Sequence, residues 1–563
     1  MPTRTNAVRS RGSHADALTD RHPNLRTARR LTIAAGLCVA GLMCTPKEAV
    51  AQGQLVYRQL GLINNSGSSQ GEQTWAWGAP SIDADGTVAY RRSSSAYLAG
   101  INSITPVIEG GYTSTGQLIR VVDQTRSSPR ISDGVVYLAS ARSGGPYLYR
   151  STDRSVETII SPGQLLDAAT GARANTLAQN FGYMSAQGNR LTGVIDTRLP
   201  NDTTMISRPA IFRIDGQQTT LVTQLVDSIA PGTNQPFSID RFVFSTRPVT
   251  PILDRQGRVI FTSYLNTYQT TTRFTSGIWG HTTDGGLTAL YLPTPNTTDP
   301  VPDAYSGLSV NSQGDILFRT QANGQYVRSN ATGALRQVST SAAFSIPSNL
   351  TYSRGLLNDS GAVLSLVGAS SVVNGVRTEL AALTITHESG AQQVIARSGD
   401  RLPGFASLFF GAPSPVGSQI PTDSARVESF SSQRGFNSIA FGALTFNNLN
   451  QAVFLANFTD GTAFARLALV AYDPLGGLST LAVTGQPLPE LGLNQTIVSI
   501  DFIGGSNTTS GHATGLNDQG LVAFRASFSD GSSRLITVQL PSPGALTTLA
   551  FASLFAARRR RGL

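Results

Sequence analysis

Two stretches near the C-terminal end carry the same pattern: FNNLNQAVFLANFTDGTA at residues 446–463 and LNDQGLVAFRASFSDGSS at residues 516–533. Both contain an Asn, a Gly or Asn three positions later, and a Phe four positions after that. Both then continue to Phe-Ser/Thr-Asp-Gly. An Asn side chain can accept backbone hydrogen bonds within a turn, and Gly or Asn tolerates a positive φ at the fourth position. The pattern therefore predicts a turn that enters a strand, with a second hairpin turn after it.

The same turn recurs upstream. Its first and fourth residues in the successive copies are Asp83 and Gly86, Asp254 and Gly257, Asn311 and Gly314, Asn358 and Gly361, Asn447 and Asn450, and Asn517 and Gly520. Weaker copies lie at residues 131–140 and 184–193. After the turn, apolar residues fall two apart, as in Val88 and Tyr90, which places them on one face of a strand directed toward a core. Ser365 takes the aromatic place in one copy.

A second recurring element is a strand that ends in a Gly turn and a Pro-containing loop, as at residues 395–404 and 480–489. Units of this size, with about four short strands and loops of variable length, favour the blades of a β-propeller. We predict an all-β body over residues 52–540 with about six to eight blades. Tandem β-sandwich domains are the alternative. In a propeller, residues 55–63 would pair with the last strand and close the ring.

The net charge of +9 is confined to the two ends of the sequence. Residues 1–51 carry +5 and the arginines at 558–561 carry +4, so the body between them is neutral. A neutral body argues against a nucleic-acid partner, which would select a basic surface. We therefore interpret both ends as targeting segments.

The N-terminal segment has the features of a secretory signal. Arg29 and Arg30 precede an apolar run at residues 31–44, and Ala49 and Ala51 form an A-x-A cleavage site. We predict a signal peptide over residues 1–51 with a long basic region, cut by signal peptidase after Ala51. The chain's two cysteines lie inside this segment, so the processed body would have neither disulfides nor cysteine metal sites.

The C-terminal segment, residues 541–563, combines a proline break, an apolar run and a basic cluster. Its marker residues are Pro541, Pro543, Gly544, Arg558, Arg559, Arg560 and Arg561. Residues 544–557 are uncharged, but this run is shorter than the stretch of about 20 residues that a helix needs to span a bilayer. The arginines would stay on the cytoplasmic side. We expect a transient membrane contact; a permanent transmembrane anchor is the alternative.

The order of Pro-x-Pro, apolar run and arginines resembles the PEP-CTERM sorting signal that exosortases recognise, with Ser542 in place of the Glu of that motif. The tandem N-x-x-G-x-x-x-F repeats resemble bacterial surface proteins of the choice-of-anchor type. Together these resemblances imply processing by an exosortase-like enzyme. They also imply export to the cell surface, outer envelope or extracellular matrix of a Gram-negative-type bacterium. They imply no activity.

The sequence offers few catalytic candidates. Gly67, Ser69 and Gly71 fit G-x-S-x-G, but they lie in a polar stretch without the strand and helix that a nucleophile elbow requires. The body histidines, His281, His387 and His512, form no close-spaced pair. We therefore predict no catalytic residue and no enzymatic activity.

Two further motifs have both a structural and a functional interpretation. Asp83 and Asp85 resemble part of a calcium loop but lack its later ligands, so we interpret them as a turn and expect no cofactor; structural calcium is the alternative. Trp75 and Trp77 alternate like one strand face, which fits core packing of the first blade or stacking on a sugar ring.

The expected function is a non-catalytic exported module that binds envelope glycans or proteins or acts as a scaffold. The alternative is a secreted polysaccharide hydrolase or lyase built on a propeller, which would need several carboxylates to converge with an Arg or His.

Overall fold

The computed structural model describes most of the body, within the unit Gly53–Leu563. The described residues are 55–64, 79–92, 95–100, 103–108, 129–142, 145–152, 155–175, 181–200, 208–225, 228–238, 250–265, 276–282, 284–294, 297–304, 307–322, 324–338, 349–373, 376–397, 400–405, 409–410, 441–459, 466–506 and 514–541. The predicted signal peptide, the tail from Ser542 onward, the 67–71 motif, both tryptophans of the 75–77 stretch and His512 lie outside them. Among these described residues, no helix is long and apolar enough to cross a bilayer.

The described strands form eight sheets that follow one another along the chain, and we call them blades 1 to 8. Blade 1 has β2 (Ser81–Ile82), β3 (Val88–Arg92), β4 (Ser95–Ala99) and β5 (Ile104–Ile108). Blade 2 has β6 (Arg130–Ser132), β7 (Val135–Arg142), β8 (Gly145–Thr152) and β9 (Ser155–Ile160). Blade 3 has β10 (Leu165–Asp167), β11 (Ala172–Ala174), β12 (Phe181–Gln187), β13 (Arg190–Arg198), β14 (Arg208–Asp215) and β15 (Gln218–Gln224). Blade 4 has β16 (Phe237–Ser238), β17 (Ile252–Leu253), β18 (Val259–Leu265), β19 (Ser276–His281) and β20 (Leu287–Tyr291).

The second half of the ring is built in the same way. Blade 5 has β21 (Ser309–Val310), β22 (Ile316–Arg319), β23 (Gln325–Arg328) and β24 (Leu335–Gln337). Blade 6 has β25 (Asn349–Leu357), β26 (Val363–Val373), β27 (Val376–Thr386) and β28 (Gln392–Arg397). Blade 7 has β29 (Phe409–Phe410), β30 (Phe441–Phe446), β31 (Ala452–Thr459), β32 (Arg466–Asp473), β33 (Gly477–Val483) and β35 (Gly505–Ser506). Blade 8 has β34 (Ile497–Asp501), β36 (Leu521–Phe528), β37 (Ser532–Gln539) and β1 (Val56–Asn64), and a short 3-10 helix, η3 (Pro489–Leu491), precedes it.

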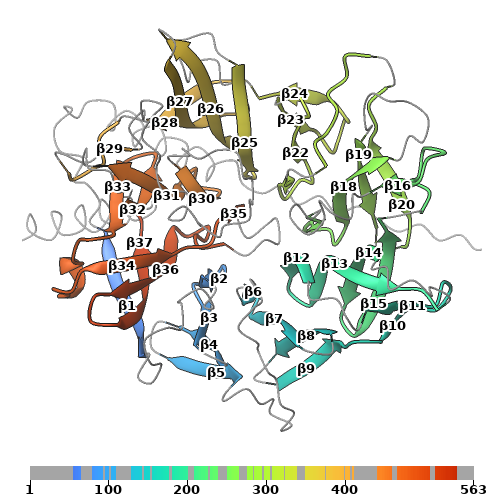
Figure 1. Ribbon diagram of the computed structural model, residues 1–563, viewed down its shortest axis with the longest axis horizontal. Coiled ribbons are helices and arrows are strands. Elements are labelled where there is room, and N and C mark those ends of the chain that lie inside the picture. The colour runs from blue at the N-terminus through green and yellow to red at the C-terminus, as the bar shows by residue number, and fades with distance from the viewer. Residues whose placement is uncertain are drawn as a thin grey trace, which may run out of the picture. The chain divides into compact units, whose positions relative to one another are not determined.

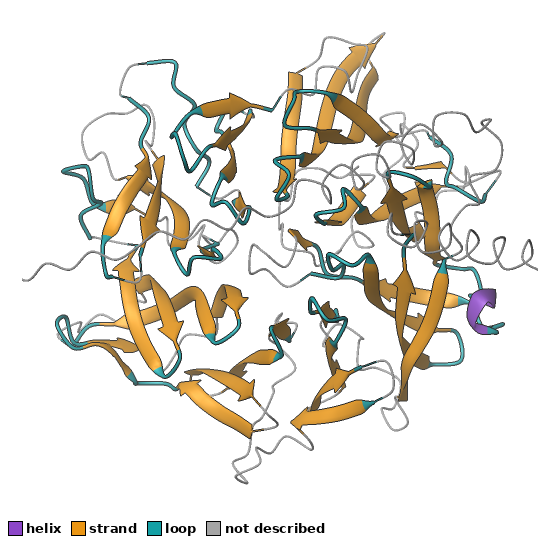
Figure 2. Ribbon diagram, turned by 180° about the vertical axis from the view of Figure 1, so that it is seen from behind, coloured by secondary structure: helices purple, strands orange, loops and turns teal. Residues whose placement is uncertain are grey.

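The eight sheets are arranged radially as an eight-bladed β-propeller (Figures 1 and 2). This arrangement confirms the predicted fold at the upper end of the expected blade number, and it excludes the β-sandwich alternative. The weaker sequence copies at residues 131–140 and 184–193 belong to blades 2 and 3.

The N-terminal strand closes the ring. β1 pairs antiparallel with β37 from Val56 opposite Gln539 to Asn64 opposite Ser532, and thereby becomes the outermost strand of blade 8. The Tyr57 hydroxyl also donates a hydrogen bond to the Leu481 carbonyl of blade 7, at 3.0 Å. The predicted pairing of residues 55–63 with the last strand is therefore confirmed.

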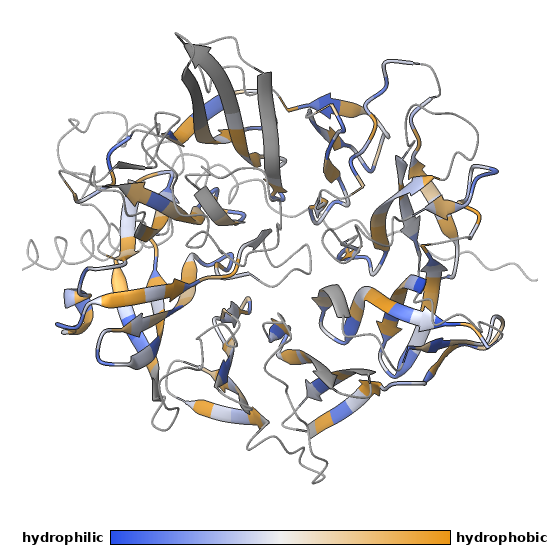
Figure 3. Cartoon of the chain, viewed as in Figure 1, coloured by the Kyte–Doolittle hydropathy of each residue, from blue (hydrophilic) through white to orange (hydrophobic). Residues whose placement is uncertain are grey.

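Each blade is buried on both faces, whereas the two-residue spacing of apolar residues in the sequence predicted a single buried face. In blade 5, Ile316 and Phe318 pack in the cluster shared with blade 4, and Leu317 between them packs in the cluster shared with blade 6. Such a cluster fills every interface between neighbouring blades. Apolar residues accordingly occur at consecutive positions along the strands (Figure 3), because the side chains on both faces of each blade are removed from water.

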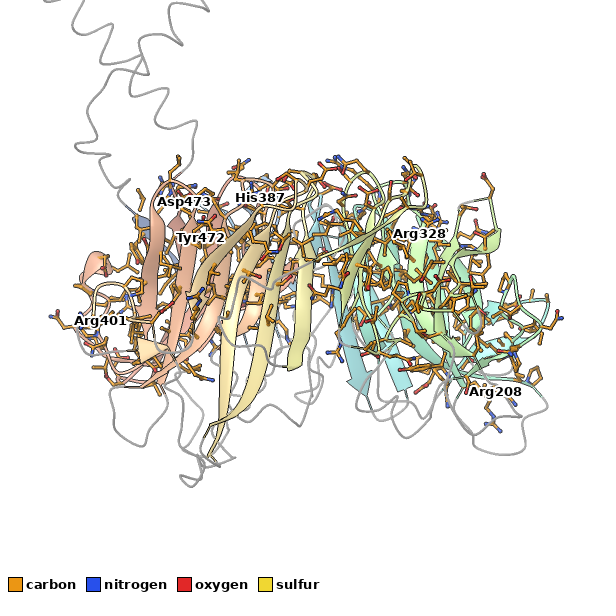
Figure 4. All side chains as sticks on the ribbon, turned by 90° about the horizontal axis from the view of Figure 1, so that it is seen from above. Arg208, Arg328, His387, Arg401, Tyr472 and Asp473 are labelled. Atoms are coloured by element: carbon orange, nitrogen blue, oxygen red, sulfur yellow. The ribbon has the colours of Figure 1, made fainter. Side chains whose placement is uncertain are left out.

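The two ends of the propeller differ in their connections. The repeat turns, such as residues 83–86 between β2 and β3, all lie at one end, which we call the turn face; its His387 and Asp473 are labelled in Figure 4. The connections from one blade to the next begin and end at the opposite end, which we call the loop face and where Arg208 lies. The longest stretches between described strands are residues 109–128, between blades 1 and 2, and residues 411–440, within blade 7, and both are flanked by strand ends near the loop face.

Candidate functional site

The repeat turns have the backbone conformation that the sequence predicts. The glycine at the fourth position has a positive φ in each copy that carries one, for example 89° at Gly86 and 83° at Gly314. Asn450, which replaces glycine in blade 7, has a φ of 59°. Its side chain adds an interaction that glycine could not make, because Asn450 Oδ1 accepts a hydrogen bond from Asn358 Nδ2 of blade 6 at 2.8 Å.

The first residue of the turn stabilises its own turn with its side-chain oxygen. Asn517 Oδ1 accepts hydrogen bonds from the backbone N–H of Gln519 (3.1 Å) and Leu521 (2.9 Å). Asn447 and Asn358 do the same in blades 7 and 6. Side-chain bonds of this kind fix the turn before the strand begins.

The side-chain nitrogen of the same Asn residues connects neighbouring blades. Asn358 Nδ2 donates to the Asn447 carbonyl (3.2 Å), Asn447 Nδ2 donates to the Asn517 carbonyl (3.0 Å), and Asn517 Nδ2 donates to the Asp83 carbonyl (3.2 Å). All three Asn residues are fully buried. A carboxylate cannot donate these bonds, so Asn rather than Asp is required where the next blade presents a carbonyl.

Asp83 occupies the first position where the next blade presents donors instead. Its carboxylate accepts hydrogen bonds from the backbone N–H of Gly134 (2.7 Å) and Asp133 (3.1 Å) in blade 2, and of Ala84 (2.8 Å) in its own turn. Burial raises the pKa of Asp83, and these hydrogen bonds oppose that rise. Asp85 accepts hydrogen bonds from Thr87. Both carboxylates therefore have the turn role that their sequence context favoured.

The second position of the turn adds a polar cluster that the sequence analysis missed. Asn448 Nδ2 donates to Asp359 Oδ2 (2.8 Å) and to Asp518 Oδ2 (3.2 Å), so one amide lies between two carboxylates from the neighbouring blades. Asn448 Oδ1 accepts from the Asp359 backbone N–H (2.9 Å), and the Asn448 N–H donates to Asp518 Oδ1 (3.0 Å). The available signal was a second Asn or Asp directly after the first in three consecutive copies.

Similar bonds join the other blades, and together they form what we call the turn ring. Bonds between the other neighbouring blades include Gly188 N–H to Ser132 Oγ, Leu253 N–H to Ser185 Oγ, Arg258 Nη1 to Asn330 Oδ1, and Ser312 N–H to Asp359 Oδ1. Every pair of adjacent blades is thus joined by at least one hydrogen bond. Because these polar groups satisfy one another, the turn ring is suited to holding the blades together rather than to chemistry.

A second recurring arrangement pairs an arginine that follows the repeat aromatic with an aspartate of the same blade. Arg319 Nη2 lies 3.0 Å from Asp303 Oδ2 in blade 5. Arg525 Nε lies 3.8 Å from Asp501 Oδ2 in blade 8. Arg525 is buried, and its Nη2 donates to Ser533 Oγ at 3.1 Å. Burial raises the pKa of Asp501 to about 6, against the opposing effect of the Arg525 charge. The sequence signal was Arg directly after the aromatic residue, as in Phe-Arg.

The structure does not bring the two described histidines together. His281 ends β19 in blade 4, where burial and the Arg213 charge lower its pKa. His387 lies in the turn after β27 of blade 6. Within the described ranges, no group of three or more His, Cys, Asp or Glu side chains is arranged to hold a metal ion.

Solved structures similar to this chain include several propellers and related folds. The Dos1 propeller is 9% identical, with a TM-score of 0.36, and the match covers 82% of this chain and 94% of that one. An oligogalacturonate lyase in complex with manganese is 12% identical with a TM-score of 0.35 and coverage of 69% and 86%. YCF48 bound to D1 peptide is 10% identical with a TM-score of 0.28 and coverage of 74% and 100%. These likenesses are too distant to bear on activity.

No curated protein matches the chain by sequence. Residues 63–545, however, match the model of a family of unknown function (DUF7453), and this stretch holds all eight blades except most of the closing strand β1, whose residues 56–62 precede it. The chain therefore belongs to this family.

Proposed function

We propose that the protein is an exported, non-catalytic binding module: an eight-bladed propeller sorted to the bacterial cell surface through its tail, presenting its loop face to glycans or proteins of the envelope. The segments proposed to direct export and sorting are residues 1–51 and 541–563.

The observation that carries this proposal is where the described chain enters and leaves the body. β1 begins at Val56, opposite Gln539, at the turn face. The Leu540 N–H donates to the Gly520 carbonyl at 2.9 Å, and Gln451 Nε2 donates to the Pro541 carbonyl at 2.6 Å. The described chain thus begins and ends at the turn face of blade 8, and the loop face lies at the other end of the strands.

The loop face supports a binding role. Connections on a rigid scaffold are where proteins most often place binding residues, and the longest connections of this chain join strands at that face. The turn face, by contrast, uses its polar groups in the turn ring. A neutral body is also better suited to uncharged glycans or protein partners than to nucleic acid.

The alternative, a polysaccharide hydrolase or lyase, has no specific support in the described part of the chain. A glycoside hydrolase typically uses a pair of carboxylates flanking the scissile bond. The carboxylates of Asp359 and Asp518 accept hydrogen bonds from the amide between them. Asp303 and Asp501, in separate blades, are each paired with an arginine.

Intact-mass analysis of the protein from native cells tests the proposal. The inner membrane, the outer surface and the medium are analysed separately. We expect a surface or medium species that begins near Gln52 and lacks the residues from about Pro543 onward. A variant in which Arg558 to Arg561 are replaced by alanine should accumulate unprocessed. A wild-type species that retains those arginines and stays in the inner membrane would contradict sorting.

A further inference from the structure

The exposed apolar side chain of Leu475 lies on the turn face, in the tight turn from Asp473 to Gly477 that joins β32 to β33. Leu475 is 50% exposed. Asp473 Oδ1 accepts hydrogen bonds from the N–H of Leu475 (2.8 Å) and Gly476 (2.9 Å), and Gly477 closes the turn with a φ of 72°. The turn therefore holds Leu475 outward instead of letting it fold back onto the blade.

The same turn is connected to the point where the chain leaves blade 8. Gln451 is fully buried, and its Nε2 donates both to Asp473 Oδ2 (2.7 Å) and to the Pro541 carbonyl (2.6 Å). One side chain thus fixes the Leu475 turn and the exit of the chain relative to each other. We call Leu475 and Pro541, which the buried Gln451 side chain connects, the exit patch.

Few residues separate this patch from the uncharged run of the tail. Leu540 is buried, and the uncharged run begins at Gly544. The intervening residues 541–543 span at most about 11 Å even when fully extended. If that run enters a bilayer, the turn face of blade 8 must lie close to the lipid surface.

We propose that the exit patch contacts the lipid surface while the tail is inserted, with Leu475 in the interfacial region and the loop face directed away from the membrane. This inference rests on the proposed function, because it requires the tail to be a membrane segment. None of the residues that hold the patch is basic, so the attraction is apolar and does not require anionic lipid. The exposed Leu475 thereby gains a role that a polar turn residue could not fill.

Single-cysteine labelling tests the contact, because residues 52–563 contain no cysteine. Leu475→Cys in this chain is labelled with an environment-sensitive fluorophore and reconstituted in phosphatidylcholine vesicles that contain headgroup-quencher lipid. Ser529→Cys, in the exposed hairpin turn between β36 and β37 at the loop face of the same blade, is the matched control. We expect the label at position 475 to be quenched several-fold more than that at position 529. A flexible linker inserted after Pro541 should abolish the difference without preventing vesicle flotation.

The outcomes separate the two proposals. A chain that does not float with vesicles overturns both, because the tail is then not a membrane segment. A chain that floats, with the label at position 475 no more quenched than that at position 529, overturns only the contact. If position 475 is instead shielded without vesicles and the chain is dimeric, a second copy covers the patch and the lipid contact is wrong. Unchanged thermal unfolding of both cysteine variants establishes that they are folded.

Discussion

At the residue scale, the choice between Asn and Asp at the start of the turns in blades 1, 6, 7 and 8 follows from what the next blade presents. Asn447 faces the Asn517 carbonyl and donates to it, whereas Asp83 faces two backbone N–H groups and accepts from both. An unmade hydrogen bond at a buried site costs more than a formed one contributes, so exchanging the two residue types should be expensive.

Replacing Asn447 with Asp tests this point. The variant loses the Nδ2 bonds to the Asn517 carbonyl and to Gln451 Oε1 and places a carboxylate oxygen against both acceptors. We expect the free energy of unfolding, measured in urea, to fall by about 1–3 kcal/mol or more. Asn189→Asp in an exposed turn is the control and should change stability little. Equal effects of the two substitutions would contradict the bridging role.

Glycine at the fourth position has a second role besides its backbone conformation. A Cβ added at Gly314 would lie 2.7 Å from Arg258 Nη2, which belongs to the neighbouring blade, whereas a Cβ at Gly390 would meet nothing within 4 Å. Both glycines have a positive φ, 83° and 86°.

We therefore predict that Gly390→Ala costs about 1–2 kcal/mol from the left-handed backbone alone. Gly314→Ala should cost a further 1 kcal/mol or so from displacement of Arg258. Thermal unfolding of the two variants measures the difference. A Gly390→Ala variant as destabilised as Gly314→Ala would show that close approach between blades does not matter here.

At the scale of the strands, the sequence predicted the turn and the following strand because these depend on local chemistry and on a period of two. The ring closure followed from the propeller interpretation. It did not predict that both strand faces are buried, since burial of the second face depends on the neighbouring blade. Ser365 shows the same limit. It replaces the repeat aromatic in blade 6, and its hydroxyl donates to Gln325 Oε1 of blade 5 at 2.7 Å, a partner about forty positions away that no local pattern specifies.

The closing strand can be tested as a separate element. A chain that lacks residues 52–64 leaves the edge of β37 unpaired, and exposed edges promote association. We expect such a chain to aggregate or to unfold at lower denaturant, and a synthetic peptide of residues 55–64 to restore the monomer on size exclusion. A scrambled peptide is the control. A truncated chain as stable as the full body would contradict closure by β1.

The Asp501–Arg525 pair in blade 8 predicts a pH dependence. Burial raises the pKa of Asp501 from 3.8 to about 6, so the folded state binds this proton more tightly than the unfolded state. The resulting stabilisation is complete below about pH 4 and is lost as the pH rises through 6. This stabilisation contributes at most about 3 kcal/mol to the free energy of unfolding. Solvent screening reduces it, because the Asp501 side chain is one-third exposed.

Chemical unfolding of wild type and Asp501→Asn between pH 4 and 7 measures this effect. Wild type should lose stability relative to the variant as the pH rises. Asp530→Asn is the control and should show almost no trend in this range, because hydrogen bonding by Ser532 lowers the pKa of Asp530 and places its titration below pH 4. A constant difference between wild type and Asp501→Asn across this range would contradict the raised pKa.

At the scale of the whole body, eight blades are joined by apolar clusters and by the turn ring at one end. The sequence predicted the propeller but not the blade number, because the turns of blades 2 and 3 depart from the repeat and blade 3 includes the additional strands β10 and β11. The sequence also did not predict that Asp359, Asn448 and Asp518 converge, since the packing of adjacent blades brings together positions 70 and 89 residues apart.

The central claim is that the propeller is displayed at the cell surface with its loop face accessible. A membrane-impermeant maleimide applied to intact native cells that express the Ser529→Cys variant tests it most directly, because the processed body has no other cysteine. The account predicts that intact cells are labelled as fully as lysed cells. Labelling that appears only after lysis would contradict it and would leave the propeller facing an internal compartment.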